Sequence, residues 1–261
     1  NIMKKILLLG CGHMGHSLLK SWLKTDKYSL TIIDPVQYKS LNKIYKTKQA
    51  IFFKSIVNLK KLSNYDALIL ATKPIDLEIV LDEISNFNLN TKTSIISVVA
   101  GKKIDLIKKR FKNNKNIFRI MPNMPAAIGQ SMNCMVSNKD ANKVNINQVR
   151  KLFMHTGKTI ILKNENQIDM ATAVSGSGPG YVFNLIDAME KGAIKLGFNE
   201  EIAKILVLET FRGSVNLLSS NNITAEKLVN YVATKGGTTE AGLNVMKKNN
   251  IHKVFRDLLK K

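Results

Sequence analysis

"KILLLGCGHMG", residues 5–15, places an apolar run directly before three glycines in the pattern G-x-G-x-x-G. Lys5–Leu9 is typical of a buried strand, and residues 15–24 carry apolar side chains at helical spacing. The glycine pattern alone is weak evidence, but between a strand and a helix it indicates a dinucleotide-binding turn. Gly10 allows the tight turn, Gly12 lets a pyrophosphate approach the backbone, and Gly15 lets the helix pack against the strand. We expect cofactor contacts from Gly10, Cys11, Gly12, His13, Met14 and Gly15.

Outward from this turn, short apolar strands alternate with helical patterns up to about residue 162. Further strands are predicted at Leu30–Ile33, Ala50–Phe53, Ala67–Ala71, Ser94–Val99, Ile117–Met121, Ser131–Val136 and Thr159–Leu162. Further helices are predicted at 37–46, 75–85, 103–112 and around 145–154. Near-continuous apolar strands separated by helices predict a parallel sheet that is covered on both faces.

After residue 163 the strand pattern stops and only helical patterns follow. They cover Asn166–Val174, Tyr181–Leu196, Glu200–Ser219, Ala225–Val232, Thr239–Lys248 and His252–Leu259. The apolar faces of this half, rich in Met, Leu and Ala, indicate a partner subunit. The predicted fold is therefore an α/β Rossmann-type doubly wound sheet in residues 1–163, followed by an all-α dimerisation domain in residues 164–261.

Asp34 ends the second predicted strand, 19 residues after Gly15, close to where a ribose-binding acid is expected. A carboxylate there accepts hydrogen bonds from the 2′-hydroxyl group and repels a 2′-phosphate. Asp34 therefore favours NADH over NADPH, although the nearby Lys39 would soften that discrimination. The alternative is that Asp34 and Pro35 form only a turn that ends the strand.

The composition argues against several other classes of protein. The formal charge is +21, but the lysines are spread along the chain and arginine occurs only five times, which argues against nucleic-acid binding as the main function. Two cysteines are too few for a disulfide framework and favour a reducing cytoplasm. No apolar run is long enough for a transmembrane span. The histidines and cysteines lack the spacing of metal ligands, so we expect no metal.

Four small-residue turns remain: "ATKP" (71–74), "MPNMPA" (121–126), "SGSGPG" (175–180) and "GGTT" (236–239). The last of these breaks a helical region. Two adjacent glycines cost roughly 2 kcal/mol of helix propensity, and the threonines that follow are typical of a new helix start. Such a junction leaves several backbone donors pointing the same way, which suits a small carboxylate.

Taken in order with "GCGHMG" and "SVVAG" (97–101), these turns make the chain resemble the pyrroline-5-carboxylate reductases, and the resemblance covers nearly the whole chain. It implies a Rossmann domain and a helical domain that interlocks in a homodimer, with larger assemblies of dimers in some cases. The implied reaction moves a hydride from NADH or NADPH to the imine carbon of 1-pyrroline-5-carboxylate and gives L-proline.

The resemblance also implies roles for individual residues. Backbone N–H groups of Gly237, Thr238 and Thr239 would bind the substrate carboxylate, and the Thr239 hydroxyl would hydrogen-bond the ring nitrogen. On the substrate side the remaining implied residues are Glu165, Ser175 and Ser177. On the cofactor side they are Ala71, Thr72, Lys73, Pro74, Ala100, Gly101 and Asn123.

One departure from the family pattern stands beside the substrate turn. The family usually has Ser-Pro before the two glycines, whereas this chain has Thr234 and Lys235. Lys235 replaces a rigid proline and adds a charge. Three other interpretations stay open: a related reductase of a hydroxy acid or another cyclic imine, a dinucleotide sensor without turnover, and a nucleic-acid binder.

Overall fold

The computed structural model describes residues 4–59 and 61–260, and their contacts divide the chain into two compact units, one ending at Pro179 and one beginning at Gly180. The strands of the first unit are β1 (Lys5–Leu9), β2 (Ser29–Ile33), β3 (Ala50–Phe53), β4 (Ala67–Leu70), β5 (Ser94–Ser97), β6 (Ile117–Met121), β7 (Ser131–Ser137) and β8 (Gly157–Ile161). Its helices are α1 (His13–Trp22), α2 (Tyr38–Ile44), α3 (Leu77–Ser85), α4 (Ile104–Arg110), α5 (Lys143–Met154) and α6 (Glu165–Ala171). Two short 3₁₀ turns, η1 (Ile56–Asn58) and η2 (Met124–Ile128), and a π-helical turn, η3 (Thr172–Gly176), complete it.

The strands form one sheet in the order β3-β2-β1-β4-β5-β6-β7-β8. Neighbours are parallel except β7, which runs antiparallel to β6. Leu9 pairs with Ile33 on one side and with Leu70 on the other, so β1, β2 and β4 end at the same edge. The strand order reverses between β1 and β4, and ligands of doubly wound sheets bind at such a point.

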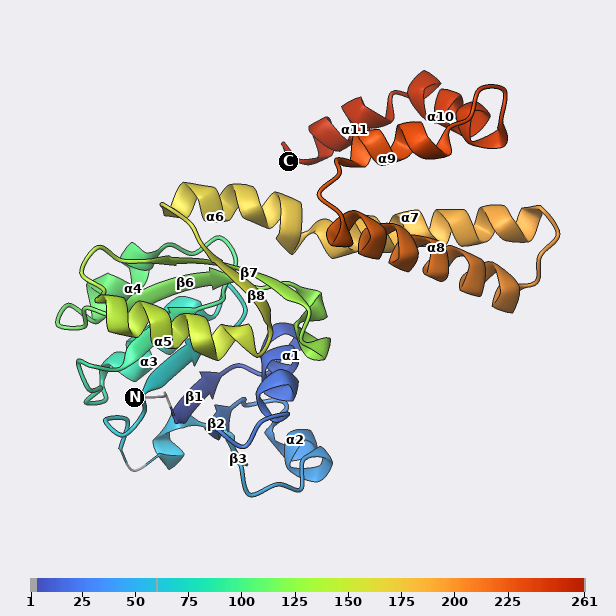
Figure 1. Ribbon diagram of the computed structural model, residues 1–261. Coiled ribbons are helices and arrows are strands. Elements are labelled where there is room, and N and C mark those ends of the chain that lie inside the picture. Colours follow the sequence, from blue (N-terminus) through green and yellow to red (C-terminus); the bar gives the residue numbers. More distant parts are fainter. Residues whose placement is uncertain (1–3, 60, 261) are drawn as a thin grey trace. The chain divides into compact units, whose positions relative to one another are not determined.

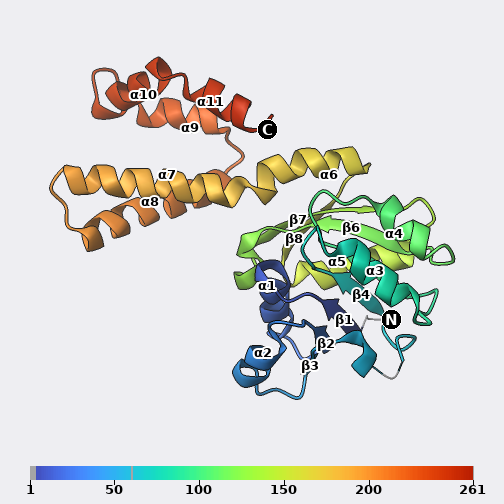
Figure 2. The same ribbon diagram turned by 180° about the vertical axis from the view of Figure 1, so that it is seen from behind.

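Apolar side chains fill both faces of the sheet, as expected for strands without polar alternation. On one face, Trp22 of α1 and Phe153 of α5 pack with strand residues such as Leu8. On the other face, Leu81 of α3 and Ile107 of α4 pack with Leu7 and its neighbours. Figure 1 shows α5 in front of the sheet. Figure 2, which views the molecule from behind, shows α3 and α4 on the other face.

The second unit is entirely helical. It contains most of α7 (Gly178–Lys195), followed by α8 (Glu200–Ser220), α9 (Ala225–Val232), α10 (Thr238–Lys248) and α11 (Ile251–Leu258). The two long helices α7 and α8 lie side by side as an antiparallel pair (Figures 1 and 2). Ala203 and Val207 are its only buried apolar residues among those described. Large exposed apolar residues include Phe183, Met189, Leu196, Ile205, Val232 and Val245.

The predicted fold class is confirmed, and the structure adds three details. The sheet is not wholly parallel, because β7 reverses direction after η2. The helix predicted from residue 166 passes into the π-helical turn η3, and α7 starts at Gly178, so Pro179 is its second residue. The predicted boundary after residue 163 stays a prediction; α6 groups with the first unit because Ile168 is buried in the sheet core. Among the described residues, no helix is long and apolar enough to cross a membrane.

Candidate functional site

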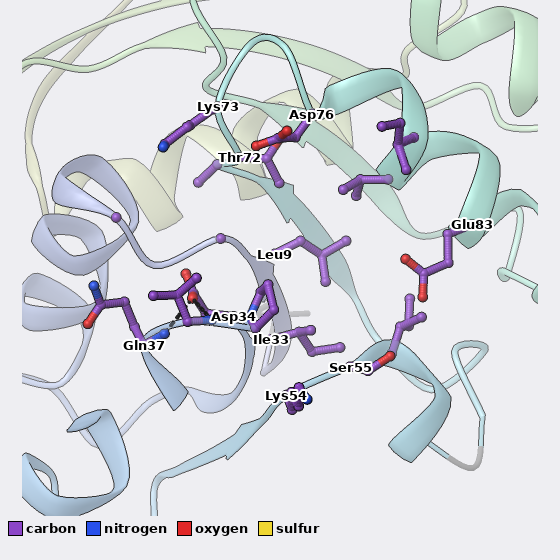
Figure 3. A pocket seen from close by; sticks show the side chains of 18 of the residues that line it. Leu9, Ile33, Asp34, Gln37, Lys54, Ser55, Thr72, Lys73, Asp76 and Glu83 are labelled. Atoms are coloured by element: carbon purple, nitrogen blue, oxygen red, sulfur yellow. Dashed lines mark hydrogen bonds between the residues drawn. The ribbon is translucent and has the colours of Figure 1, made fainter. Parts of the chain in front are cut away.

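A cavity of about 600 Å³ lies at the carboxyl ends of β1, β2 and β4. Figure 3 shows side chains from these three strand ends and from α3 around it. The predicted cofactor residues that line it are Gly10, Gly12, Asp34, Ala71, Thr72 and Lys73. Val36, Gln37, Lys54 and Ser55, which sequence reasoning did not select, also line it. The cavity therefore joins the glycine turn to the loops after β2, β3 and β4.

The glycine turn fits closely against its neighbours at Gly10 and Gly15 and has open space at Gly12. Gly10 has a φ of +87°, and a Cβ there would lie 2.6 Å from the carbonyl oxygen of Ala71. A Cβ on Gly15 would lie 2.2 Å from the carbonyl oxygen of Gly10. At Gly12 a Cβ would meet nothing within 4 Å, and this residue caps α1 without a side-chain hydrogen bond. Bare backbone at a helix N-terminus is what a pyrophosphate needs, so this turn fits a dinucleotide.

Asp34 is the most heavily bonded side chain of the cavity, with only 8 % of its surface exposed. Its Oδ2 accepts a hydrogen bond of 2.7 Å from the N–H of Cys11 in the glycine turn. Its Oδ1 accepts bonds of 2.9 Å and 2.7 Å from the N–H groups of Val36 and Gln37 (Figure 3). A carboxylate offers about four lone-pair sites, so one stays free. Asp34 thus forms the strand-ending turn and has one lone-pair site that these three backbone bonds do not use.

The side chains of Cys11 and His16 have no features of catalytic groups. Cys11 is buried, and this burial, followed by the charge of Asp34, raises the pKa of its thiol to about 12. The thiol therefore stays protonated and unreactive at neutral pH. His16 is 2.7 Å from the hydroxyl oxygen of Tyr45, and burial followed by Lys20 lowers its pKa. His13 is exposed at the start of α1, and Met14 packs on the core.

The loop after β4 carries an unpaired hydroxyl group. Its backbone is fixed by a 2.8 Å bond from the N–H of Ala71 to the carbonyl oxygen of Leu9. The Oγ1 of Thr72 is buried and has no partner in the described part of the chain. An unpaired buried hydroxyl in a cavity suits a bound polar ligand. Ala100 and Gly101 are exposed after β5 and do not belong to the described lining of this cavity, and neither does Pro74.

Asn123 connects the turn after β6 to the π-helical turn η3. Its Nδ2 donates to the carbonyl oxygen of Ser175 at 2.9 Å, and its Oδ1 accepts from the N–H of Met132 at 3.0 Å. The hydroxyl of Ser175 donates to the carbonyl oxygen of Ala171, and the N–H of Ser177 donates to that of Thr172, both at 2.9 Å. Single π-helical turns are frequent at functional sites. The structure thus brings the "MPN" and "SGSG" motifs together.

Glu165 belongs to a charge cluster around the buried Arg119 that sequence reasoning missed. Its Oε1 accepts a 2.9 Å bond from the N–H of Ile104 at the start of α4, and it pairs with Arg119 at 3.4 Å. Arg119 lies in β6 with 1 % of its side chain exposed and pairs with Asp169 at 2.7 Å. The sequence signal for this cluster was a charged residue, Arg119, inside the otherwise apolar strand "IFRIM". Glu165 therefore ties α4 and β6 to α6.

The "GGTT" turn opens α10, as its sequence predicts. Gly236 has a φ of +76°, and Gly237 is the helix cap without a side-chain bond. The N–H of Gly237 donates to the carbonyl oxygen of Thr234 at 3.0 Å. The N–H of Gly236 donates to Oε2 of Glu240 at 2.7 Å, a contact that was not predicted. The first-turn N–H groups of Thr238 and Thr239 have no acceptor within the described residues.

Together these features define the class of the protein. A doubly wound sheet with a glycine turn, an acid after β2 and a cavity at the strand-order reversal is the architecture of a nicotinamide-dependent oxidoreductase. Among the described residues, no cluster of His, Cys, Asp or Glu could hold a metal ion. Residues 5–101 match the family described as NADP oxidoreductase, coenzyme F420-dependent, and residues 165–261 match pyrroline-5-carboxylate reductase dimerisation.

Comparison with individual proteins narrows the class to one family. The chain is 31% identical to pyrroline-5-carboxylate reductase 2 of Bacillus subtilis, over 94% of this chain and 87% of that protein. It is 30% identical to the Aquifex aeolicus pyrroline-5-carboxylate reductase, over 94% and 89% of the two chains. The chain belongs to the pyrroline-5-carboxylate reductase family.

Solved structures agree in fold over the whole chain. The Plasmodium falciparum pyrroline carboxylate reductase, solved with NADP bound, has a TM-score of 0.87 at 26% identity, covering 100% of this chain and 96% of that one. The Coxiella burnetii pyrroline-5-carboxylate reductase also has a TM-score of 0.87, at 25% identity and the same coverage. A prephenate dehydrogenase of A. aeolicus, with a TM-score of 0.58 at 15% identity, shares the fold alone.

Proposed function

We propose that this protein reduces 1-pyrroline-5-carboxylate to L-proline with NADH or NADPH, the last step of proline biosynthesis. The observation that carries the proposal is the turn at the start of α10, where two consecutive threonine N–H groups and a hydroxyl group stand free beside bare glycine backbone. Membership in the pyrroline-5-carboxylate reductase family supports the same substrate.

The substrate carboxylate is assigned to the N–H groups of Thr238 and Thr239, because a helix N-terminus favours an anion. The N–H of Gly237 is already bonded to Thr234. Gly237 therefore contributes mainly the lack of a side chain, because a Cβ there would lie 2.7 Å from Oγ1 of Thr234. Glu165, Ser175 and Ser177 are assigned to the substrate side of the first unit; Glu165 acts there through the backbone and charge contacts that it makes.

The ring nitrogen takes a proton from water, and the hydride then adds to the carbon of the protonated C=N group, whose π electron pair returns to the nitrogen as the bond becomes single. The reduced nicotinamide supplies the hydride. The Thr239 hydroxyl group is assigned to the ring nitrogen, where a hydrogen bond orients the ring for transfer. Until the hydride adds, this fixed hydroxyl dipole rather than bulk water stabilises the charge on the protonated nitrogen.

The cavity beside the glycine turn is assigned to the adenosine half of the cofactor. Gly10, Gly12 and the first turn of α1 would hold the pyrophosphate, and the orphaned Thr72 hydroxyl would hydrogen-bond a polar group of the cofactor. The free acceptor of Asp34 is assigned to the ribose 2′-hydroxyl group, and it favours NADH. The remaining cofactor residues are proposed as Cys11, His13, Met14, Gly15, Ala71, Lys73, Pro74, Ala100, Gly101 and Asn123.

The exposed apolar residues of α7–α11 support a homodimer, since a unit with so few buried residues needs a partner to cover it. The match of residues 165–261 to the family's dimerisation region supports the same conclusion. We propose in addition that dimers associate further and that the protein works in the cytoplasm. The second point rests on two free, buried cysteines.

A product assay tests the proposed function. Purified protein with NADH and DL-1-pyrroline-5-carboxylate should form L-proline, detected by chiral chromatography. 1-Pyrroline, which lacks the carboxylate, is the matched control substrate and should react far more slowly. Equal rates on both compounds would contradict the carboxylate assignment, and absence of L-proline from folded protein would contradict the function.

A further inference from the structure

Glu240 contacts the turn that opens α10, although the reduction itself requires no carboxylate there. We propose that Glu240 is a positioning residue: it holds the Gly236-Gly237 turn so that the N–H groups of Thr238 and Thr239 are ready for the substrate carboxylate. This inference rests on the proposed function, because it concerns the same site.

The bond between the N–H of Gly236 and Glu240 is a variant of the capping box found at helix N-termini. With Gly237 as the cap, Glu240 is the third residue of the helix, where a capping-box acid usually bonds the N–H of the cap residue. Here the carboxylate reaches one residue further back, and Oε2 accepts from the N–H of Gly236 at 2.7 Å. The N–H of Gly237 is satisfied instead by Thr234. These two bonds fix both glycines and leave Thr238 and Thr239 free.

The turn needs this bond because its own residues do not restrict it. Gly236 is held at a φ of +76°, and glycine loses more conformational freedom on ordering than any other residue. Lys235 has no ring to fix the backbone before the glycines. The cap residue has no side chain to accept a bond. A charge-assisted bond to a backbone N–H is about twice as strong as a neutral one, and it orders the turn before the substrate arrives.

A role limited to helix stability would look different. An acidic residue in a first turn is favoured by the helix dipole wherever the helix lies. Glu226 occupies such a place in the first turn of α9 and is the matched control. If Glu240 acts only through the dipole, Glu226→Ala and Glu240→Ala should have the same effects, and neither should change substrate binding.

The experiment compares Glu240→Ala, Glu240→Asp, Glu240→Gln and Glu226→Ala in the full-length protein. Removing the acceptor or shortening the side chain should raise the KM for 1-pyrroline-5-carboxylate about tenfold, the size of one charge-assisted bond. The kcat and the KM for NADH should stay within about twofold. Glu240→Gln keeps an acceptor oxygen and should remain within about threefold of wild type. Titration calorimetry with L-proline alone should show the same order of affinities without turnover.

Each result decides for or against the inference. An unchanged KM for 1-pyrroline-5-carboxylate in Glu240→Ala or Glu240→Asp overturns the inference. An increase of this KM in Glu240→Gln that is as large as in Glu240→Ala overturns it as well. A KM for NADH that rises as much as the KM for 1-pyrroline-5-carboxylate would show a general defect and would also overturn the inference. If the wild-type protein forms no L-proline, the proposed function is contradicted instead. If the wild-type protein is active and the Glu240 variants have unchanged KM values, only this inference is contradicted.

Discussion

Asp34→Asn is the substitution whose effect follows most directly from the structure. Both carboxylate oxygens of Asp34 accept backbone N–H bonds, one from Cys11 and two from the turn at Val36 and Gln37. Asparagine has only one acceptor oxygen, so either the N–H of Cys11 or the N–H groups of the turn must face its NH₂ group. If the oxygen stays on the turn, the bond to Cys11 is lost and two donors oppose each other.

The magnitude follows from the type of bond that is lost. A buried hydrogen bond to a charged group contributes about 1.5–3 kcal/mol, and Asp34 is buried enough for that range to apply. We therefore expect the free energy of unfolding of the first unit to fall by about 2 kcal/mol, within that range. Loss of the ribose acceptor should raise the KM for NADH roughly tenfold, since a tenfold change corresponds to about 1.4 kcal/mol. NADPH should lose less, because the charge that repels its 2′-phosphate has gone.

Urea unfolding and steady-state kinetics with both cofactors measure these two effects. Asp76→Asn is the matched control, because Asp76 lines the same cavity but is exposed and makes no side-chain cap bond. Stability within 0.5 kcal/mol of wild type would refute the structural part, since surface substitutions fall in that range. An unchanged ratio of kcat/KM for NADPH and NADH would show that Asp34 does not bind the ribose.

Three other predictions concern the hydroxyl, thiol and imidazole groups. Thr239→Ala should lower kcat at least tenfold with the fold intact, whereas Thr239→Ser should retain most activity; wild-type kinetics in the alanine variant would remove Thr239 from the mechanism. Cys11, whose thiol pKa is raised to about 12, should not react with a maleimide at pH 8 until the protein unfolds; rapid labelling of native protein would contradict its burial. The pKa values of His16 and His155 are lowered from 6.5 by burial and then by a nearby lysine, so the unfolded chain binds protons more readily. The contribution of these two histidines to the free energy of unfolding should therefore be complete above pH 6.5 and fall as the pH decreases below it. A His16→Gln, His155→Gln variant whose free energy of unfolding falls with pH as steeply as that of wild type would disprove this.

The sheet could be predicted from the sequence because its signals are local. The run Lys5–Leu9 followed by Gly10, Gly12 and Gly15 specifies a strand, a turn and a helix start within a few residues. Strand bounds at Ala50–Phe53 and Ile117–Met121 agree with the structure for the same reason. The direction of β7 was not predicted, because apolar periodicity is the same in parallel and antiparallel strands.

The contacts of the candidate site depend on residues far apart in the chain. Asn123 meets Ser175 across 52 positions, and Arg119 meets Asp169 across 50, so neither partner is visible in a local pattern. The π-helical turn at Thr172–Gly176 keeps helical spacing and therefore looked like ordinary helix. The contact between Gly236 and Glu240 is local, and the capping-box spacing was the signal that could have found it.

The central claim is that the chain transfers a hydride to 1-pyrroline-5-carboxylate from a nicotinamide cofactor held by the glycine turn and Asp34. The most direct measurement is the oxidation of NADH and of NADPH, in parallel, by purified protein with DL-1-pyrroline-5-carboxylate. We predict rapid oxidation coupled to L-proline formation, with a higher kcat/KM for NADH. Folded protein that oxidises neither cofactor with this substrate would contradict the claim, and a preference for NADPH would contradict the role given to Asp34.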